Sequence, residues 1–203
     1  MKPFRSPYAG YDVLAKWDTP SWDDRTRDVV RRRLHEVPPR RFLSEVEWHT
    51  LEAICARLLP QPERSHPIPI VPWIDEKLHH DWRDGFRYED MPPLREAWRL
   101  GVNGIDQEAR MTFARDFVAL DGAQQDAVLR AVQSGNVRSE LWQTLPAARF
   151  FTMILLKEAV GEYYAHPAAW SEVGFGGPAS PRGYVRLGMN QRDPWEAAGT
   201  DRS

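Results

Sequence analysis

The chain has almost no cysteine, and its sequence predicts neither an export signal nor a membrane anchor. Its single cysteine, Cys55, excludes an intrachain disulfide and any Cys-x-x-Cys zinc or haem-attachment motif. The longest apolar stretch, ARFFTMILLKEAV, contains Lys157 and is too short to cross a bilayer. The first residues, MKPFRSPYAGYDVL, include neither an apolar core nor a twin arginine, so we expect no export signal and no membrane insertion.

Net charge is also nearly absent. The formal charge is −2, so the chain as a whole is not drawn to nucleic acid. One basic run, Val29 to Arg41, stands out, and acidic residues surround it. A solvated helix face is therefore the favoured interpretation. The alternative is a nucleic-acid adaptor that uses Arg31, Arg32, Arg33, Arg40 and Arg41.

The motifs of common catalytic and nucleotide-binding sites are missing. No GxSxG, HExxH or GxxxxGK[ST] sequence occurs. The glycines of GFGGP resemble a dinucleotide-binding loop, but that loop needs a strand before it and a helix after it. Here a helical pattern precedes the glycines and prolines follow them. We therefore expect no catalytic, cofactor-binding or metal-binding residues in this chain.

Histidines give the one alternative to that expectation. His79 and His80 lie near Asp81 and Asp84, and Glu76-x-x-His79 is half of a di-iron ligand motif. His49 has glutamates close by in sequence, but not at the spacing of that motif. An exposed polar turn is the favoured interpretation of residues 79–84. The alternative function is a helical metal-dependent enzyme that uses His49, or His79 and His80, with nearby carboxylates.

Tryptophan and proline are abundant instead, with nine and 17 residues, many of them outside helical patterns. Between these segments the apolar spacing predicts helices. Thr19 or Ser21 can cap the first, which Pro38 and Pro39 end. Ser44 with Glu47 forms a capping box for the second, which Pro60 stops.

Further helices are expected along the rest of the chain. A short one runs from about Pro72 to His80, and a long pattern follows Met91-Pro92-Pro93, where Gly101 and Gly104 indicate a bend or a close helix contact. Asp121 with Gln124 caps the next, which turns Ala127, Val128, Ala131 and Val132 inward and closes at Gly135. Residues 147–166 form a central apolar helix ended by Pro167.

These patterns predict an all-α fold, because no convincing strand alternation appears. We expect a compact helical bundle over residues 19–166. An extended arm over residues 1–18 precedes it, and an irregular tail rich in glycine, proline and tryptophan over residues 167–203 follows it.

Four segments are distinctive: LSEVEWHTLEAICARLLPQ, PIPIVPWIDEKL, FRYEDMPPLREAWRLGVNGID and, most specific, AHPAAWSEVGFGGPASPRGYVRL. Together they resemble one protein family, the small subunit (subunit 3, or gamma subunit) of membrane-linked flavin dehydrogenases of the gluconate 2-dehydrogenase type. The resemblance runs from about Phe42 to Trp195. It implies a non-catalytic subunit that binds, stabilises and chaperones a large sugar- or polyol-oxidising flavoprotein of the glucose–methanol–choline type.

The same resemblance implies where cofactor and partners lie. FAD belongs to the large subunit and no cofactor to this chain, and an electron-transfer subunit is a further candidate partner. Family members often carry a twin-arginine signal, which this sequence lacks. We therefore expect a cytoplasmic complex, or a periplasmic one if another subunit carries the signal.

The tail is the predicted partner-binding segment. Its aromatic residues can act as buried anchors, its arginines can pair with carboxylates or carbonyls, and its glycines and prolines allow close backbone approach. The alternative is that the tail packs on its own bundle. The predicted residues are Trp170, Gly174, Phe175, Gly176, Gly177, Pro178, Pro181, Arg182, Gly183, Tyr184 and Arg186.

Overall fold

The structure is a computed structural model that describes residues 6–8, 10–62, 64–82, 85, 89–179, 183, 188, 191 and 196–198. Within these residues all regular structure is helical, which confirms the predicted all-α class. None of the helices described is both long and apolar enough to cross a membrane. The chain forms two compact units, a terminal unit of residues 1–37 with 163–203 and a central unit of residues 38–162.

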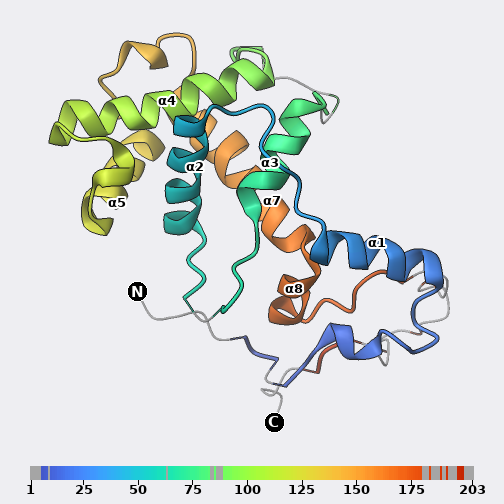
Figure 1. Ribbon diagram of the computed structural model, residues 1–203. Helices are drawn as coiled ribbons and strands as arrows, with labels where there is room; N and C mark the ends of the chain where they lie inside the picture. The colour runs from blue at the N-terminus through green and yellow to red at the C-terminus, as the bar shows by residue number, and fades with distance from the viewer. Residues whose placement is uncertain are drawn as a thin grey trace. The chain divides into compact units, whose positions relative to one another are not determined.

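This grouping differs from the expected division at residues 18 and 166. The terminal unit combines both ends of the chain with α1 (Asp24–His35). Residues 13–16, expected as part of an extended arm, form the 3₁₀ helix η1 (Val13–Lys16). After the central unit come the end of α7 (Lys157–Ala165), the short helix α8 (Pro167–Trp170) and the 3₁₀ turn η5 (Ser171–Val173) (Figure 1).

The central unit is a helical bundle. α4 passes the first turn of α2, where Glu47 accepts from Arg99 Nη1 and Asn103 Nδ2, each at 3.0 Å (Figure 1). Its elements are α2 (Glu45–Leu58), α3 (Ile70–His79), α4 (Leu94–Phe113), η2 (Phe117–Ala119), α5 (Gly122–Ser134), η3 (Glu140–Trp142), α6 (Ala147–Arg149), the π-helical segment η4 (Phe150–Leu156) and α7 as far as Glu162.

Two helix starts follow the predicted capping chemistry. Ser44 Oγ accepts from the Glu47 amide at 3.2 Å, and the Glu47 carboxylate accepts from the Ser44 amide at 2.8 Å. Asp121 and Gln124 form the same reciprocal pair at the start of α5. Gly135 ends α5 with a left-handed φ of +76°. Both capping boxes are confirmed, because each depends only on residues three apart.

Other local predictions were wrong in detail. The N-cap of α1 is Asp23, which accepts from the Thr26 amide at 2.8 Å, and not Thr19 or Ser21. α3 begins at Ile70, because Pro72 falls in a first turn whose amides have no intrahelical acceptor.

The inward face of α5 also differs from its prediction. Ala127 is exposed, while Leu129 is buried beside Val128 and Val132. The buried face of α5 therefore runs through Val128, Leu129 and Val132, and burial of leucine removes more apolar surface from water than burial of alanine does.

The two glycines of α4 mark a close contact and not a bend. A Cβ on Gly101 would lie 2.1 Å from Cζ of Phe150, and one on Gly104 would lie 2.6 Å from Cζ2 of Trp142. α4 is continuous through both positions. Phe150, which is fully buried, therefore packs directly on the backbone of α4 at the point where η4 begins.

The predicted central helix contains this π-helical segment and ends at Ala165. Pro167 follows the end of α7 and cannot continue that helix. It also occupies the first helical position of α8, where proline is favoured. His166 is buried, and its Nδ1 accepts from the Ala168 amide at 3.3 Å. It serves as the N-cap of α8.

Candidate partner-binding site

Three tryptophans organise the terminal unit. Trp22 is 2 % exposed and lies edge-to-face against Trp17 and Trp170, with ring centroids 5.8 Å and 6.5 Å away. Val13 and Val30 complete the buried cluster, against which Tyr11, Leu14, Trp17 and Leu34 pack. This small core joins the N-terminal segment and α1 to α8, so both ends of the chain share one apolar centre.

Hydrogen bonds fasten the N-terminal segment to residues 171–178. Ser6 Oγ donates to the Glu172 carbonyl at 2.9 Å, and the Val13 amide donates to Ser171 Oγ at 3.1 Å. Trp22 Nε1 donates to the carbonyl of Pro178 at 3.1 Å. These bonds pair backbone polar groups of η1, of η5 and of the irregular residues that follow η5.

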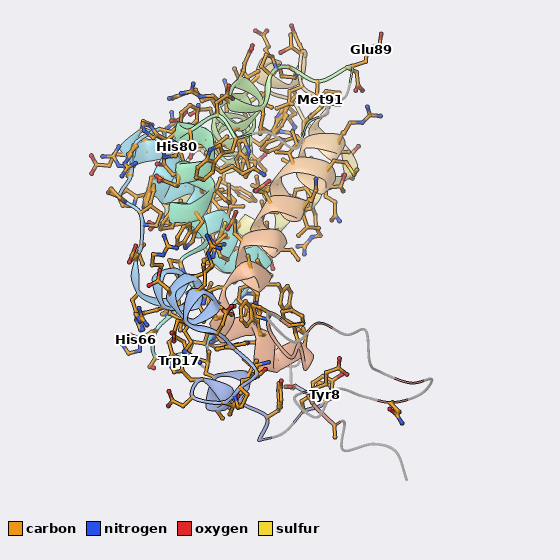
Figure 2. All side chains as sticks on the ribbon, turned by 90° about the vertical axis from the view of Figure 1, so that its right-hand side faces the viewer. Tyr8, Trp17, His66, His80, Glu89 and Met91 are labelled. Carbon is orange, nitrogen blue, oxygen red and sulfur yellow. The ribbon has the colours of Figure 1, made fainter. Side chains whose placement is uncertain are left out.

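Two glycines allow the close approach of these segments. Gly174 and Gly177 have left-handed φ values of +68° and +71°. A Cβ on Gly174 would meet the Tyr8 ring at 2.6 Å, and one on Gly177 would meet the Trp22 ring at 2.9 Å. Both positions therefore require glycine for conformation and for space. Tyr8 and Trp17 of this unit are labelled in Figure 2.

Between these glycines Phe175 remains accessible. Its side chain is 45 % exposed and rests edge-to-face on Trp170, with ring centroids 5.5 Å apart. Its amide donates to the Trp170 carbonyl at 3.0 Å, and its carbonyl accepts from the Tyr11 hydroxyl at 3.4 Å. Phe175 is thus a solvent-facing aromatic ring on a backbone held from both sides.

The other predicted tail residues differ in their environments. Trp170 is 9 % exposed and packs in the chain's own core, the arrangement that the sequence left open as the alternative. Gly176 and Gly177 are buried, Pro178 is half-buried and Gly183 is exposed. Four predicted residues lie outside the residues that the structure describes: Pro181, Arg182, Tyr184 and Arg186.

The histidines of the alternative metal site make local contacts. His49 Nδ1 lies 3.1 Å from Glu52, and His80 Nε2 lies 3.1 Å from Glu76. The His80 ring stacks on Trp82 at 4.7 Å (His80 is labelled in Figure 2) and meets the His79 ring edge-on at 4.9 Å. Across the described part of the chain, no three His, Cys, Asp or Glu side chains are grouped so that they could hold a metal ion.

The basic run is divided by the structure. Arg31 and Arg32 lie on α1 and pair with Asp28 at 3.0 and 3.5 Å. Arg40 Nη1 donates to the Leu43 carbonyl at 3.0 Å, and Arg41 pairs with Glu76 at 3.3 Å. Each of these four guanidinium groups therefore has a partner within the chain. A face of α1 lined with such pairs is the solvated surface that the surrounding acids indicate.

Cys55 is buried in α2. Loss of solvent raises the pKa of its thiol to about 12, and the nearby Glu52 charge acts in the same direction. The thiolate that would act as a nucleophile or metal ligand is therefore scarce at neutral pH. Cys55 therefore acts as a small apolar residue of the core.

Residues 6–22 are the part of the site whose role the sequence did not identify. Tyr8, Trp17 and Trp22 pack within the chain. Their signal is visible in the sequence, since Trp17, Trp22 and Trp170 all lie at the margins of helical patterns. Composition cannot show which aromatic residues meet, because a contact such as that of Trp22 with Trp170 joins residues far apart in sequence.

Comparison with known proteins places the chain in a family. A family model described as "Gluconate 2-dehydrogenase subunit 3" matches residues 45–177, which is more than half of the 203 residues. The match ends two residues after Phe175, short of the expected limit near Trp195. No curated protein and no solved structure matches the chain significantly. The chain belongs to the gluconate 2-dehydrogenase subunit 3 family.

Proposed function

We propose that this chain is a non-catalytic subunit that binds and stabilises the large flavoprotein subunit of a dehydrogenase. Family membership carries the proposal, because the family is named as one subunit of a multi-subunit dehydrogenase. The proposed partner is a glucose–methanol–choline-type enzyme that oxidises a sugar or polyol. Its FAD and its substrate site would lie wholly in that partner.

The terminal unit supports this proposal with a suitable surface. Phe175 presents an aromatic ring to solvent, and Val173 beside it is 44 % exposed. Aromatic side chains are enriched among the residues that dominate binding energy at protein interfaces. A backbone that is already ordered loses less conformational entropy on binding than a flexible tail does. Phe175 is therefore the proposed anchor, and its ring packs edge-to-face on the buried ring of Trp170.

Residues beyond 178 extend the proposed surface along the chain. Tyr184 is a second candidate anchor, and Arg182 and Arg186 are candidates to pair with partner carboxylates or carbonyls. We further propose that the complex resides in the cytoplasm, with the periplasm as the alternative if another subunit carries an export signal. An electron-transfer subunit is a further proposed partner.

Co-expression tests the proposal directly. The chain is produced alone and together with the flavoprotein encoded beside it, with an affinity tag on this chain only. We expect the flavoprotein to co-purify with the tagged chain. When the two subunits are separated, the flavin absorbance should be found with the larger subunit. We also expect sugar- or polyol-oxidising activity in the soluble fraction to fall at least about tenfold when this chain is omitted.

Two results would contradict it. One is a flavoprotein that is equally soluble and active without this chain and never co-purifies with it. The other is turnover by this chain alone after loading with iron, manganese or zinc, which would support the metal-dependent alternative.

A further inference from the structure

The N-terminal segment lies outside the family match and yet contacts its last residues. The match begins at residue 45 and ends at residue 177. Residues 6–22 precede it in sequence, while residues 171–178 include its final stretch. The two segments are far apart in sequence: the bond from Ser6 to Glu172 spans 166 residues.

The later segment is regular only over its first residues. Beyond η5 (Ser171–Val173), residues 174–178 are irregular, and the Phe175 amide donates to the Trp170 carbonyl at 3.0 Å. Four hydrogen bonds join residues 171–178 to Ser6, Tyr11, Val13 and Trp22. Such contacts help to offset the conformational entropy that an irregular segment loses on ordering.

The close contacts at two glycines also indicate that the N-terminal segment orders the later one. A Cβ on Gly174 would lie 2.6 Å from the Tyr8 ring, and one on Gly177 would lie 2.9 Å from the Trp22 ring and 3.3 Å from Cγ2 of Val13. These contacts come from three positions spread along residues 6–22. The N-terminal segment therefore shapes the later one along most of its length and does not merely touch it at one point.

We infer that residues 6–22 form an intramolecular clamp that fixes the shape of residues 171–178 in the isolated chain. The surface around Phe175 is then formed before any partner arrives and is not ordered by binding. The inference rests on the proposed function only where it names a flavoprotein as the protein that binds this surface. The clamp itself is a property of this chain alone.

Hydrogen exchange of the full-length chain, without a partner, tests the clamp. We expect backbone amides of residues 171–178 to exchange at least about tenfold more slowly than in an unstructured peptide of the same sequence. Trp22→Ala removes a buried ring and the bond to Pro178, so it should raise their exchange at least about tenfold. Peptides from α2 should remain unchanged and report that the central unit is intact.

A double-mutant cycle between Tyr8 and Gly174 provides a gentler test, since neither residue belongs to the buried tryptophan cluster. Gly174→Ala should accelerate exchange of residues 171–178, because its new methyl group meets the Tyr8 ring. In a Tyr8→Ala background that contact is gone and only the backbone strain remains. The same substitution should then accelerate exchange by a smaller factor.

Gly183→Ala is the matched control. Gly183 also has a left-handed φ, +66°, but no atom lies within 4 Å of its Cβ position. We expect this variant to leave the exchange of residues 171–178 unchanged.

The outcomes separate the clamp from the proposed function. Exchange of residues 171–178 at the unstructured rate in the wild-type chain overturns the clamp, and so do strictly additive effects in the Tyr8 and Gly174 cycle. Slow exchange with coupling, together with failure to bind any flavoprotein, supports the clamp and overturns the proposed function. Slow exchange that appears only after the flavoprotein is added supports the function and overturns the clamp.

Discussion

Asp75 is the buried carboxylate that holds the connection leading into α2. It is 0 % exposed and accepts from the backbone amides of Arg41, Phe42 and Leu43 at 2.6, 3.1 and 2.7 Å. The sequence contains a signal for this role. Asp75 lies on the same stripe of α3 as Val71, Ile74 and Leu78, so an acid interrupts an otherwise apolar face.

Replacement of Asp75 should therefore destabilise the central unit. Asp75→Ala leaves three amides without an acceptor, and we expect the free energy of unfolding to fall by about 3 kcal/mol. Urea denaturation followed by circular dichroism measures this change. The control, Asp18→Ala, removes an exposed carboxylate and should change stability by less than about 0.5 kcal/mol. Equal effects of the two substitutions would contradict the role given to Asp75.

At the scale of elements, the contact between α4 and η4 is possible because Gly101 has no side chain. Gly101→Ala places a methyl carbon 2.1 Å from Cζ of Phe150, which is too close for a non-bonded contact. We expect the free energy of unfolding to fall by about 2 kcal/mol through overpacking. Gly161→Ala in α7 is the matched control, because nothing lies within 4 Å of its Cβ position. Alanine is a better helix former than glycine at this position, so Gly161→Ala should raise the free energy of unfolding by up to about 1 kcal/mol. Thermal denaturation of both variants measures the difference, and a stabilised Gly101→Ala chain would disprove the close contact.

A second link between elements is electrostatic. Arg57 of α2 donates from Nε and Nη2 to the two carboxylate oxygens of Asp126 in α5, both at 2.8 Å. This pairing holds the pKa of Asp126 below its usual range and raises that of Arg57. A lowered pKa in the folded chain means that the ionised form favours folding. Its contribution is complete above the ordinary aspartate pKa and is lost as the pH falls through the lowered value.

Asp126→Asn should therefore show a pH-dependent deficit. We expect the variant to lose about 0.5 kcal/mol of stability at neutral pH, since both side chains are about one-third exposed and solvent screens the pair. Urea denaturation over a series of pH values from neutral into the acid range measures the change, and the deficit should shrink as the pH falls through the lowered pKa of Asp126. High salt at neutral pH should reduce it as well. A deficit that stays constant with pH would show that the substitution acts through packing.

At the scale of the whole molecule, the terminal unit is the part proposed to meet a partner, and Phe175 tests it. Phe175→Ala should weaken the affinity for the flavoprotein about tenfold or more, because an exposed aromatic anchor is lost at the interface. The helical content of the chain should stay intact, since the ring is 45 % exposed. Trp82→Ala removes an aromatic that is 57 % exposed from the central unit and should leave the affinity unchanged. Isothermal titration or surface binding compares the variants, and equal affinities would remove Phe175 from the interface.

The sequence by itself determined the all-α class and several helix ends, notably the capping boxes at Ser44 and Asp121. These features depend on neighbours three or four residues apart, where local hydrogen bonding and periodicity decide the conformation. The sequence also marked the glycines of α4 as a contact or a bend and the segment around Phe175 as ordered but irregular.

Only the tertiary structure decided which of those alternatives holds. It showed that Phe150 occupies the space beside Gly101, that Asp75 faces three amides more than 30 residues away, and that Trp170 is buried by the chain's own N-terminal segment. The physical reason is that such contacts join residues with no fixed sequence spacing. Their partners are selected by packing the whole chain, so composition and period reveal the residues involved but not the pairs they form.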